Sequence, residues 1–215
     1  MIASYGIKFI VAGFFLTLTA ILWANWKDSV SLFIISVCLA LLTVFLTFFY
    51  RNPPRDIPED SNLILATADG RILSVEDIEN EYIGGAGKKV SIFMSPINVH
   101  INRIPVSGRV EYVKYVPGKF FRAFLDKASE ENEHNEIGLV FNGGRLIFKQ
   151  IAGIMARRIS CTAVADQEVI AGDIYGMIHF GSRAEIFLPE DVEVLVSADD
   201  NVLAGETIIG RYTKN

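Results

Sequence analysis

Two long apolar segments near the N-terminus constrain the fold more than any other feature of the sequence. Residues 7–24 and 29–50 are apolar apart from Lys8 and a few serine and threonine residues. A helix of about 20 apolar residues crosses the hydrocarbon core of a bilayer. The connection between the two segments is too short to form a domain. The sequence therefore predicts a transmembrane hairpin of two helices within residues 1–52.

A cleaved signal peptide and a pair of buried core helices are the alternatives to this hairpin. No small-residue cleavage site follows the first segment, and the second begins almost at once, which favours the hairpin. Lys8 starts the first helix, and Arg51 and Arg55 follow the second, so the positive-inside rule predicts that both ends of the hairpin face the cytoplasm. We therefore expect the chain to lie in the inner (cytoplasmic) cell membrane, with residues 53–215 as a domain on the cytoplasmic side.

The pattern of residues 53–215 is that of a mainly β domain. Short apolar or alternating runs are separated by turn-forming residues, and Asn142-Gly143 between two of them is a strong hairpin signal. Helix signals are few, namely residues 119–129 and a stretch after Pro96. We predict an antiparallel barrel or sandwich-like domain with few short helices, preceded by the transmembrane hairpin. The expected strands include residues 63–66, 89–94, 108–113, 137–141, 145–151, 184–188 and 192–196.

Charge and cysteine content argue against several classes of protein. The net charge of −5 gives no reason to expect nucleic acid as a partner, because nucleic-acid-binding proteins present basic faces. Cys38 lies in the second apolar segment and Cys161 in the β domain, so they form no disulfide framework and fit a reducing compartment. The spacing of histidine, cysteine and carboxylate residues matches no common metal site, so no metal is expected.

The chain contains three histidines, and histidine is the side chain best suited to proton transfer near neutral pH. His100 precedes Pro105, and its structural alternative is a hydrogen-bonded histidine at a strand edge. His134 lies in an acidic stretch, and its structural alternative is a position in a solvated loop. His179 is two residues from Gly181, and strand alternation would place both on the same face.

Four short motifs occur in order along residues 51–211, and together they are more specific than any one of them. They are Asp69-Gly70, the Ser-Pro-Ile-Asn-Val-His of residues 95–100 leading to Pro105-Val106-Ser107-Gly108, Asn132-Glu133-His134, and Gly181-Ser182 followed by an apolar strand. This combination resembles the phosphatidylserine decarboxylase family, in its short, compact branch. Members of that family are pyruvoyl-dependent, self-cleaving proenzymes.

The resemblance implies a lyase that makes its own cofactor. The chain would cleave itself at 181/182 into fragments 1–181 and 182–215, and Ser182 would become a covalent pyruvoyl group. A Schiff base between this group and phosphatidylserine in the bilayer would lose CO2 and yield phosphatidylethanolamine. The implied catalytic residues are Ser182, His100 and Asp69, with cleavage between Gly181 and Ser182. The implied partners are the lipid substrate and the chain's own two fragments, with a homo-oligomer left open.

One position departs from the pattern of the longer family members. These carry two histidines three residues apart, the second of which belongs to an Asp-His-Ser relay for self-processing. Arg103 occupies the corresponding position here, and an arginine is a poor general base because it stays protonated. Either His100 serves both stages, or another base acts in self-cleavage, or Arg103 has an electrostatic role. Arg103, His134 and His179 are therefore the candidates for supporting roles.

Two other classes of protein remain as alternatives at this point. A membrane-anchored serine hydrolase would also use a serine and a histidine, but the residues around Ser182 form neither a Gly-x-Ser-x-Gly nor a Ser-x-x-Lys motif. A non-catalytic membrane-anchored β-domain would need none of these residues. Self-cleavage into two fragments distinguishes the decarboxylase from both alternatives.

Overall fold

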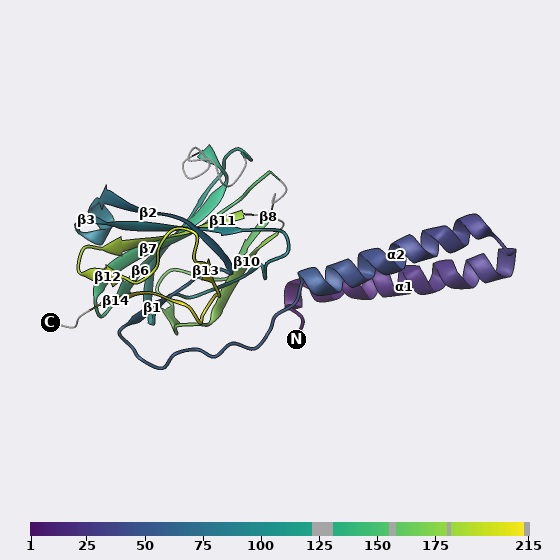
Figure 1. Cartoon of the computed structure of the whole chain (residues 1–215), viewed down its shortest axis with the longest axis horizontal. Coiled ribbons are helices and arrows are strands. Elements are labelled where there is room, and N and C mark those ends of the chain that lie inside the picture. The colour runs from purple at the N-terminus through teal and green to yellow at the C-terminus, as the bar shows by residue number, and fades with distance from the viewer. Residues whose placement is uncertain (122–130, 155–157, 180–181, 213–215) are drawn as a thin grey trace. The chain divides into compact units, whose positions relative to one another are not determined.

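The computed structural model describes residues 1–121, 131–154, 158–179 and 182–212 of the chain. Its contacts divide the chain into two compact units, Met1–Pro54 and Arg55–Asn215, and each unit is described by itself. Figure 1 shows that the first unit is helical and that the second is built mainly of strands.

The first unit is a hairpin of two helices, α1 (Ser4–Lys27) and α2 (Val30–Phe49). Both are long and apolar enough to cross a membrane. Asp28 ends α1 in the left-handed conformation, and the Ser29 side chain caps α2 by accepting from the Leu32 amide. Gly6 allows the helices to approach closely, because a Cβ atom there would lie 2.2 Å from the Tyr50 side chain. Most of the apolar side chains in both helices are exposed, which is consistent with membrane association.

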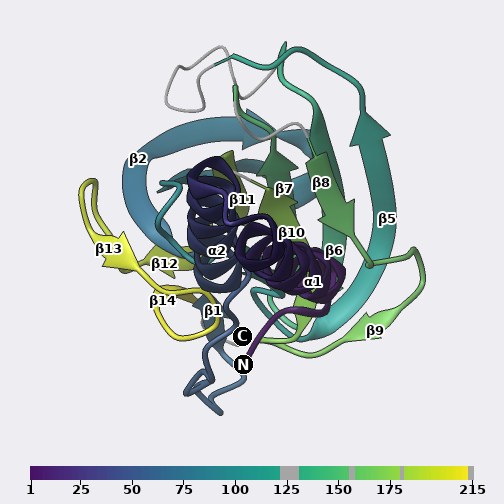
Figure 2. The same ribbon diagram turned by 90° about the vertical axis from the view of Figure 1, so that its right-hand side faces the viewer.

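The second unit is dominated by an antiparallel sheet of eight strands, in the order β13-β2-β3-β11-β7-β6-β5-β9. Figure 2 shows this sheet curling around the strands that it encloses. Because β11 pairs with both β3 and β7, it is a central strand of the sheet and not an edge strand. The strands are β2 (Gly70–Asn80), β3 (Gly85–Met94), β5 (Gly108–Val116), β6 (His134–Phe141), β7 (Gly144–Ile151), β9 (Glu168–Val169), β11 (Ser182–Pro189) and β13 (Asn201–Val202).

Two sheets of three strands complete the unit. One has the order β1-β14-β12, with β1 (Leu63–Leu65), β12 (Val192–Val194) and β14 (Ile208–Tyr212). The other has the order β4-β10-β8, with β4 (Ile101–Arg103), β8 (Arg158–Cys161) and β10 (Ile174–His179). A short 3-10 helix, η1 (Glu81–Ile83), joins β2 to β3. We call the β4-β10-β8 sheet the small sheet and the eight-stranded sheet the main sheet.

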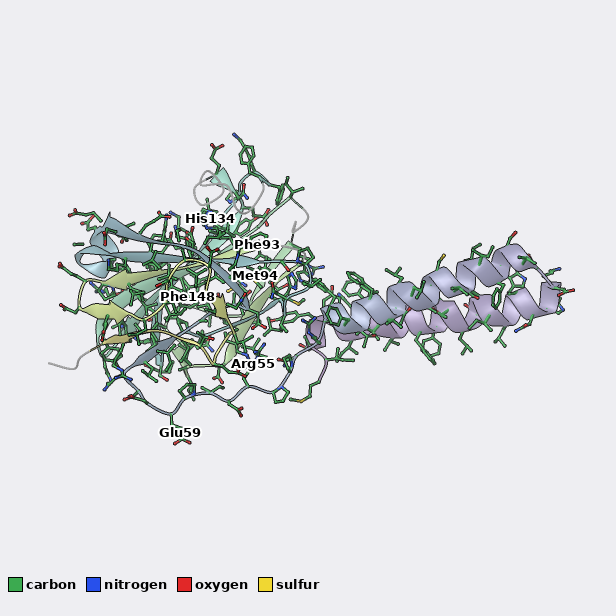
Figure 3. All side chains as sticks on the ribbon, viewed as in Figure 1. Arg55, Glu59, Phe93, Met94, His134 and Phe148 are labelled. Carbon is green, nitrogen blue, oxygen red and sulfur yellow. The ribbon has the colours of Figure 1, made fainter. Side chains whose placement is uncertain are left out.

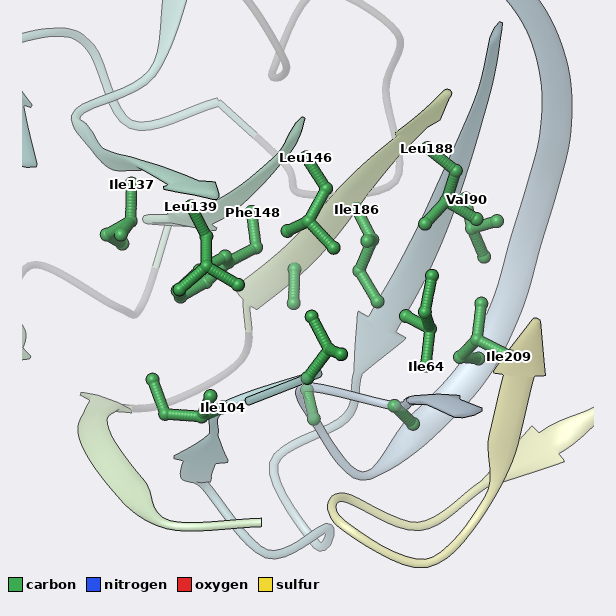
Figure 4. Close-up of a cluster of buried hydrophobic side chains, with 14 of the residues drawn as sticks. Ile64, Val90, Ile104, Ile137, Leu139, Leu146, Phe148, Ile186, Leu188 and Ile209 are labelled. Atoms are coloured by element: carbon green, nitrogen blue, oxygen red, sulfur yellow. The ribbon is translucent and has the colours of Figure 1, made fainter. Parts of the chain in front are cut away.

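One apolar core lies on the inner face of the main sheet. Alternate residues of β11, namely Ala184, Ile186 and Leu188, are fully buried in it. Val90 and Ile92 of β3 and Leu146 and Phe148 of β7 belong to the same cluster (Figure 4). Burial of apolar side chains of this size stabilises the fold by roughly 1.5–3 kcal/mol each, before the cost of ordering the chain.

The mainly β, antiparallel fold with an apolar helical hairpin confirms the predicted fold class. Asn142 and Gly143 form the turn between β6 and β7, as their sequence predicts. The helix expected after Pro96 is wrong, because a turn forms there and the Ser95 amide donates to the Asn98 side chain. Most of the helix expected over residues 119–129 lies outside the described residues.

Candidate active site

Connections between the main sheet and the small sheet lie side by side at one place, which we call the seam. The chain leaves β3 of the main sheet through residues 95–100 and enters β4 of the small sheet. It returns from β10 to β11 at residues 180–181, which are outside the described residues. Because β3 pairs with β11 and β4 pairs with β10, the two crossings are neighbours. The Gly181-Ser182 junction therefore lies where the chain passes from one sheet to the other.

Ser182 is the first residue of β11, and its backbone pairs with Met94, the last residue of β3. The segment that contains His100 begins directly after Met94, which is labelled in Figure 3. On the other side of the crossing, the Ile178 amide donates to the His100 carbonyl over 3.2 Å. The backbone of His100 thus contacts Ile178 of β10, and its place beside the junction stays a prediction. Gly181 and the side chain of Ser182 are not described, so the shared face expected for His179 and Gly181 stays a prediction.

His100 is fully buried, and its ring orientation is set by a carbonyl group. Its Nδ1 atom lies 2.9 Å from the Asn98 carbonyl oxygen. Since a carbonyl can only accept, Nδ1 carries the proton in this hydrogen bond, and Nε2 is the atom that can take up a proton. The side chain therefore has the tautomer that a general base needs.

His134 repeats the same arrangement on the other side of β7. Its Nδ1 atom lies 2.7 Å from the Asn132 carbonyl oxygen, so both histidines belong to an Asn-x-His turn. His134 is buried, which excludes the solvated acidic loop considered from the sequence. Its backbone pairs with Ile151, which in turn pairs with Arg183. His134 consequently lies on the sheet face of Arg183, two strands away from β11.

His179 ends β10 and stays neutral at physiological pH. Burial, followed by the positive charge of Arg158, lowers the pKa of His179 from 6.5 to about 4. Its Nε2 atom lies 3.3 Å from the Ser160 hydroxyl of the neighbouring strand β8. The three histidines thus come from three different strands or connections near the seam.

The carboxylate of Asp69 forms an ion pair with an arginine. Arg55 donates to both carboxylate oxygens over 2.9 and 2.8 Å, and the Ala204 amide donates to Oδ1 over 2.8 Å. Glu206 lies 3.8 Å from the same guanidinium group. Sequence reasoning assigned Arg55 only to the basic flank of the hairpin, so this partner of Asp69 was missed.

Arg103 belongs to the same group of charges. Its Nη1 atom donates to the Gly172 carbonyl over 2.7 Å. Burial lowers the pKa of Arg103, and the charge of Arg55 lowers it further, whereas Asp69 raises it. The structure therefore brings together Asp69 and Arg103, and it adds Arg55 and Glu206. We call these four residues the charge cluster.

A network of buried amide side chains fixes the small sheet against the main sheet. Gln150 of β7 donates to the Asn102 side chain of β4 over 2.9 Å and to the Ser160 carbonyl of β8 over 3.2 Å. Asn135 of β6 donates to Gln150 over 3.3 Å. Gly176 must lack a side chain here, because a Cβ atom would lie 2.6 Å from the Gln150 amide. Polar residues inside strands were the signal for this network, and sequence reasoning missed it.

The fold and the seam define a mainly β protein with an apolar helical hairpin and a Gly-Ser junction between two sheets, flanked by an oriented histidine. A profile of the family "Phosphatidylserine decarboxylase" matches residues 42–210. The chain therefore belongs to the phosphatidylserine decarboxylase family.

Curated relatives cover between 80% and 98% of the chain. The phosphatidylserine decarboxylase proenzyme of Pelobacter propionicus is 43% identical over 211 residues, 98% of this chain and 96% of the relative. The proenzyme of Syntrophus aciditrophicus is 42% identical over 215 residues, 98% of this chain and 97% of the relative. The proenzyme of Chlorobium phaeobacteroides (strain DSM 266) is 45% identical over 173 residues, 80% of this chain and 82% of the relative.

Because His179 is buried in its neutral form, the free energy of unfolding should depend on pH. Between pH 6.5 and about 4 the unfolded chain binds a proton at His179 that the folded chain does not. The free energy of unfolding should therefore fall by about 1.4 kcal/mol per pH unit as the pH drops through this window. Denaturant titrations of the wild type and His179→Gln measure the contribution of His179 to this pH dependence, because glutamine does not titrate. Equal pH slopes for the two proteins would show that His179 titrates normally.

Proposed function

We propose that the chain converts phosphatidylserine to phosphatidylethanolamine and CO2 through a pyruvoyl group made from Ser182. The observation that supports the proposal is that Ser182 begins β11 opposite Met94, the residue that precedes the segment of His100, in a chain of this family. The proenzyme names of the relatives fit a self-processing enzyme of the pyruvoyl type. The single experiment that tests the proposal most directly is the fragment pattern on a denaturing gel.

Self-cleavage begins with attack of the Ser182 hydroxyl oxygen on the Gly181 carbonyl carbon. The peptide bond breaks as an ester forms, and removal of the Ser182 α-proton then expels the Gly181 carboxylate. Tautomerisation and attack by water release ammonia and leave a pyruvoyl group at the start of fragment 182–215. A neighbouring proton acceptor is required, and the tautomer of His100 provides one at Nε2.

The fold suits a chain that is cut at this bond. After cleavage, β11 stays paired with β3 on one side and β7 on the other. β14 likewise stays paired with β1 and β12. The two fragments therefore remain one folded domain, and the new N-terminus stays opposite Met94.

Decarboxylation needs an electron sink and a proton. The pyruvoyl carbonyl supplies the sink when the substrate amine is bound to it. We assign His100 to deliver the proton to the carbon atom that loses CO2, through Nε2. The Asn98 carbonyl keeps the ring in one orientation for this transfer. Asp69 is assigned to the site as a fixed anion within the charge cluster.

The hairpin places the enzyme where its substrate is. Phosphatidylserine stays in the leaflet, and two apolar helices keep the domain at the same surface. The basic residues that flank the helices support an inner membrane location with the catalytic domain on the cytoplasmic side.

Replacing Ser182 tests self-processing. Ser182→Ala should give a full-length chain without decarboxylase activity, because the attacking oxygen and the atoms of the cofactor are both removed. A denaturing gel and CO2 release measure the two effects, and Ser74→Ala on β2 serves as the control that should still cleave. Full cleavage of Ser182→Ala at the same bond would refute the scheme.

Removing the hairpin separates self-cleavage from use of the lipid. A chain without residues 1–52 should still cleave itself, since that reaction is intramolecular and the deletion spares Arg55. It should act poorly on phosphatidylserine in vesicles but better on substrate dispersed in detergent, because membrane capture is lost. Full activity on vesicles would show that the hairpin has another purpose.

Replacing His100 divides the two stages. His100→Ala should lower the rate of phosphatidylethanolamine formation by about 100- to 10,000-fold, which is the usual range for general acid–base catalysis. Gel analysis scores cleavage, and CO2 release is measured on whatever processed protein is recovered. Loss of both would assign both stages to His100, and normal cleavage without turnover would confine it to decarboxylation. Normal turnover would remove His100 from the site.

A further inference from the structure

The residues that follow the hairpin in sequence are built into the charge cluster. The Arg55 and Asp69 side chains are only 5% and 6% exposed, so their ion pair is shielded from water (Figure 3 labels Arg55). Both oxygens of the carboxylate accept from one guanidinium nitrogen, and the Ala204 amide also donates to Oδ1. A charge-assisted contact of this kind fixes the position of the carboxylate as well as its charge.

The next two residues fasten the same segment to the cluster. The Asp56 amide donates to the Glu206 carboxylate over 3.3 Å. Ile57 packs directly on Gly172, since a Cβ atom at Gly172 would lie 2.5 Å from Ile57 Cδ1. Gly172 is also the residue whose carbonyl accepts from Arg103. Segment 55–57 therefore contacts Asp69, Glu206 and also Gly172, whose carbonyl accepts from Arg103.

Two cations compete for one carboxylate in this arrangement. Arg55 holds Asp69, while the nearby Arg103 is attracted to Asp69 and repelled by Arg55. Without Arg55, the buried carboxylate would lose its main partner, and attraction would draw it toward Arg103. The site of Asp69 is thus determined by a residue outside the four family motifs.

From these contacts we infer that Arg55 is a positioning residue for self-cleavage, acting through Asp69. The inference rests on the proposed function, in which Asp69 belongs to the site as a fixed anion, and it extends that role to self-cleavage. A displacement of about 1 Å in such a site can cost a factor of about 100 in rate. The first residue of the domain after the hairpin and its two prolines would then be required for maturation of the enzyme, in addition to any role as a basic flank of the membrane segment.

The test follows the rate at which fragment 182–215 appears in full-length chain made in the presence of detergent or membranes. Arg55→Ala should slow self-cleavage by about 100-fold. Arg55→Lys should slow it less than Arg55→Ala does, because lysine keeps the positive charge. It should still be slower than the wild type, because the guanidinium group is lost. Added ethylguanidinium should restore part of the rate to Arg55→Ala. Arg71→Ala is the matched control, since Arg71 of β2 also forms an arginine–aspartate pair, with Asp199, but both side chains are exposed.

A double substitution shows whether Arg55 acts through Asp69. Arg55→Ala should change the residual rate of an Asp69→Asn chain no further, because the interaction is already lost. A further loss as large as in the wild type would overturn the inference, as would an Arg55→Ala chain that cleaves within twofold of the wild type. If Arg55→Ala does not fold, Arg55→Lys decides: cleavage at the wild-type rate overturns the inference. A wild-type chain that never cleaves would instead refute the proposed function.

Discussion

Pairing of β11 with β3 and β7 is the constraint on which the rest of the site depends. The first residue of β11 is Ser182, so the sheet fixes the backbone position of the residue that the proposed function assigns to self-cleavage. The same pairing brings the end of β3, and with it the segment of His100, beside the junction. A bond between two sheets can be broken without separating them, because the strand hydrogen bonds on either side remain. Cleavage at the proposed position would thus leave the domain intact although the chain is broken.

Buried polar groups, rather than apolar contacts alone, hold the two sheets in register at the seam. The apolar core lies on the inner face of the main sheet, and apolar packing is tolerant of small shifts. The Gln150–Asn102 hydrogen bond is directional. If one strand slid along its neighbour, both amides would be left unpaired at a cost of about 1–3 kcal/mol each. Asn132 has a similar function, since it donates to the Ala152 carbonyl and its own carbonyl orients His134. Precision at this site therefore depends on amide side chains that do no chemistry.

The sequence allowed prediction of the elements with strong local patterns and of the residues within the family motifs. The helical hairpin and the Asn142-Gly143 turn have unmistakable local signals. Strand β2 was missed because several charged residues interrupt its apolar pattern, and some of them form exposed pairs such as Lys88–Asp77 with the neighbouring strand. The small sheet was missed because its strands are short and pair across large distances in sequence. Arg55 could not be assigned to Asp69 from the sequence, since the contact depends on tertiary packing between an irregular segment and the start of β2.

An arginine at position 103, where the family resemblance implies a histidine in longer members, suits this cluster. A histidine could pass a proton to and from a carboxylate, whereas an arginine can only stabilise the anion. Here Asp69 and Glu206 provide negative charges close to the positive charges of Arg55 and Arg103. Under the proposed function, the arginines would serve the electrostatic role, and His100, oriented by the Asn98 carbonyl, would serve the proton-transfer role.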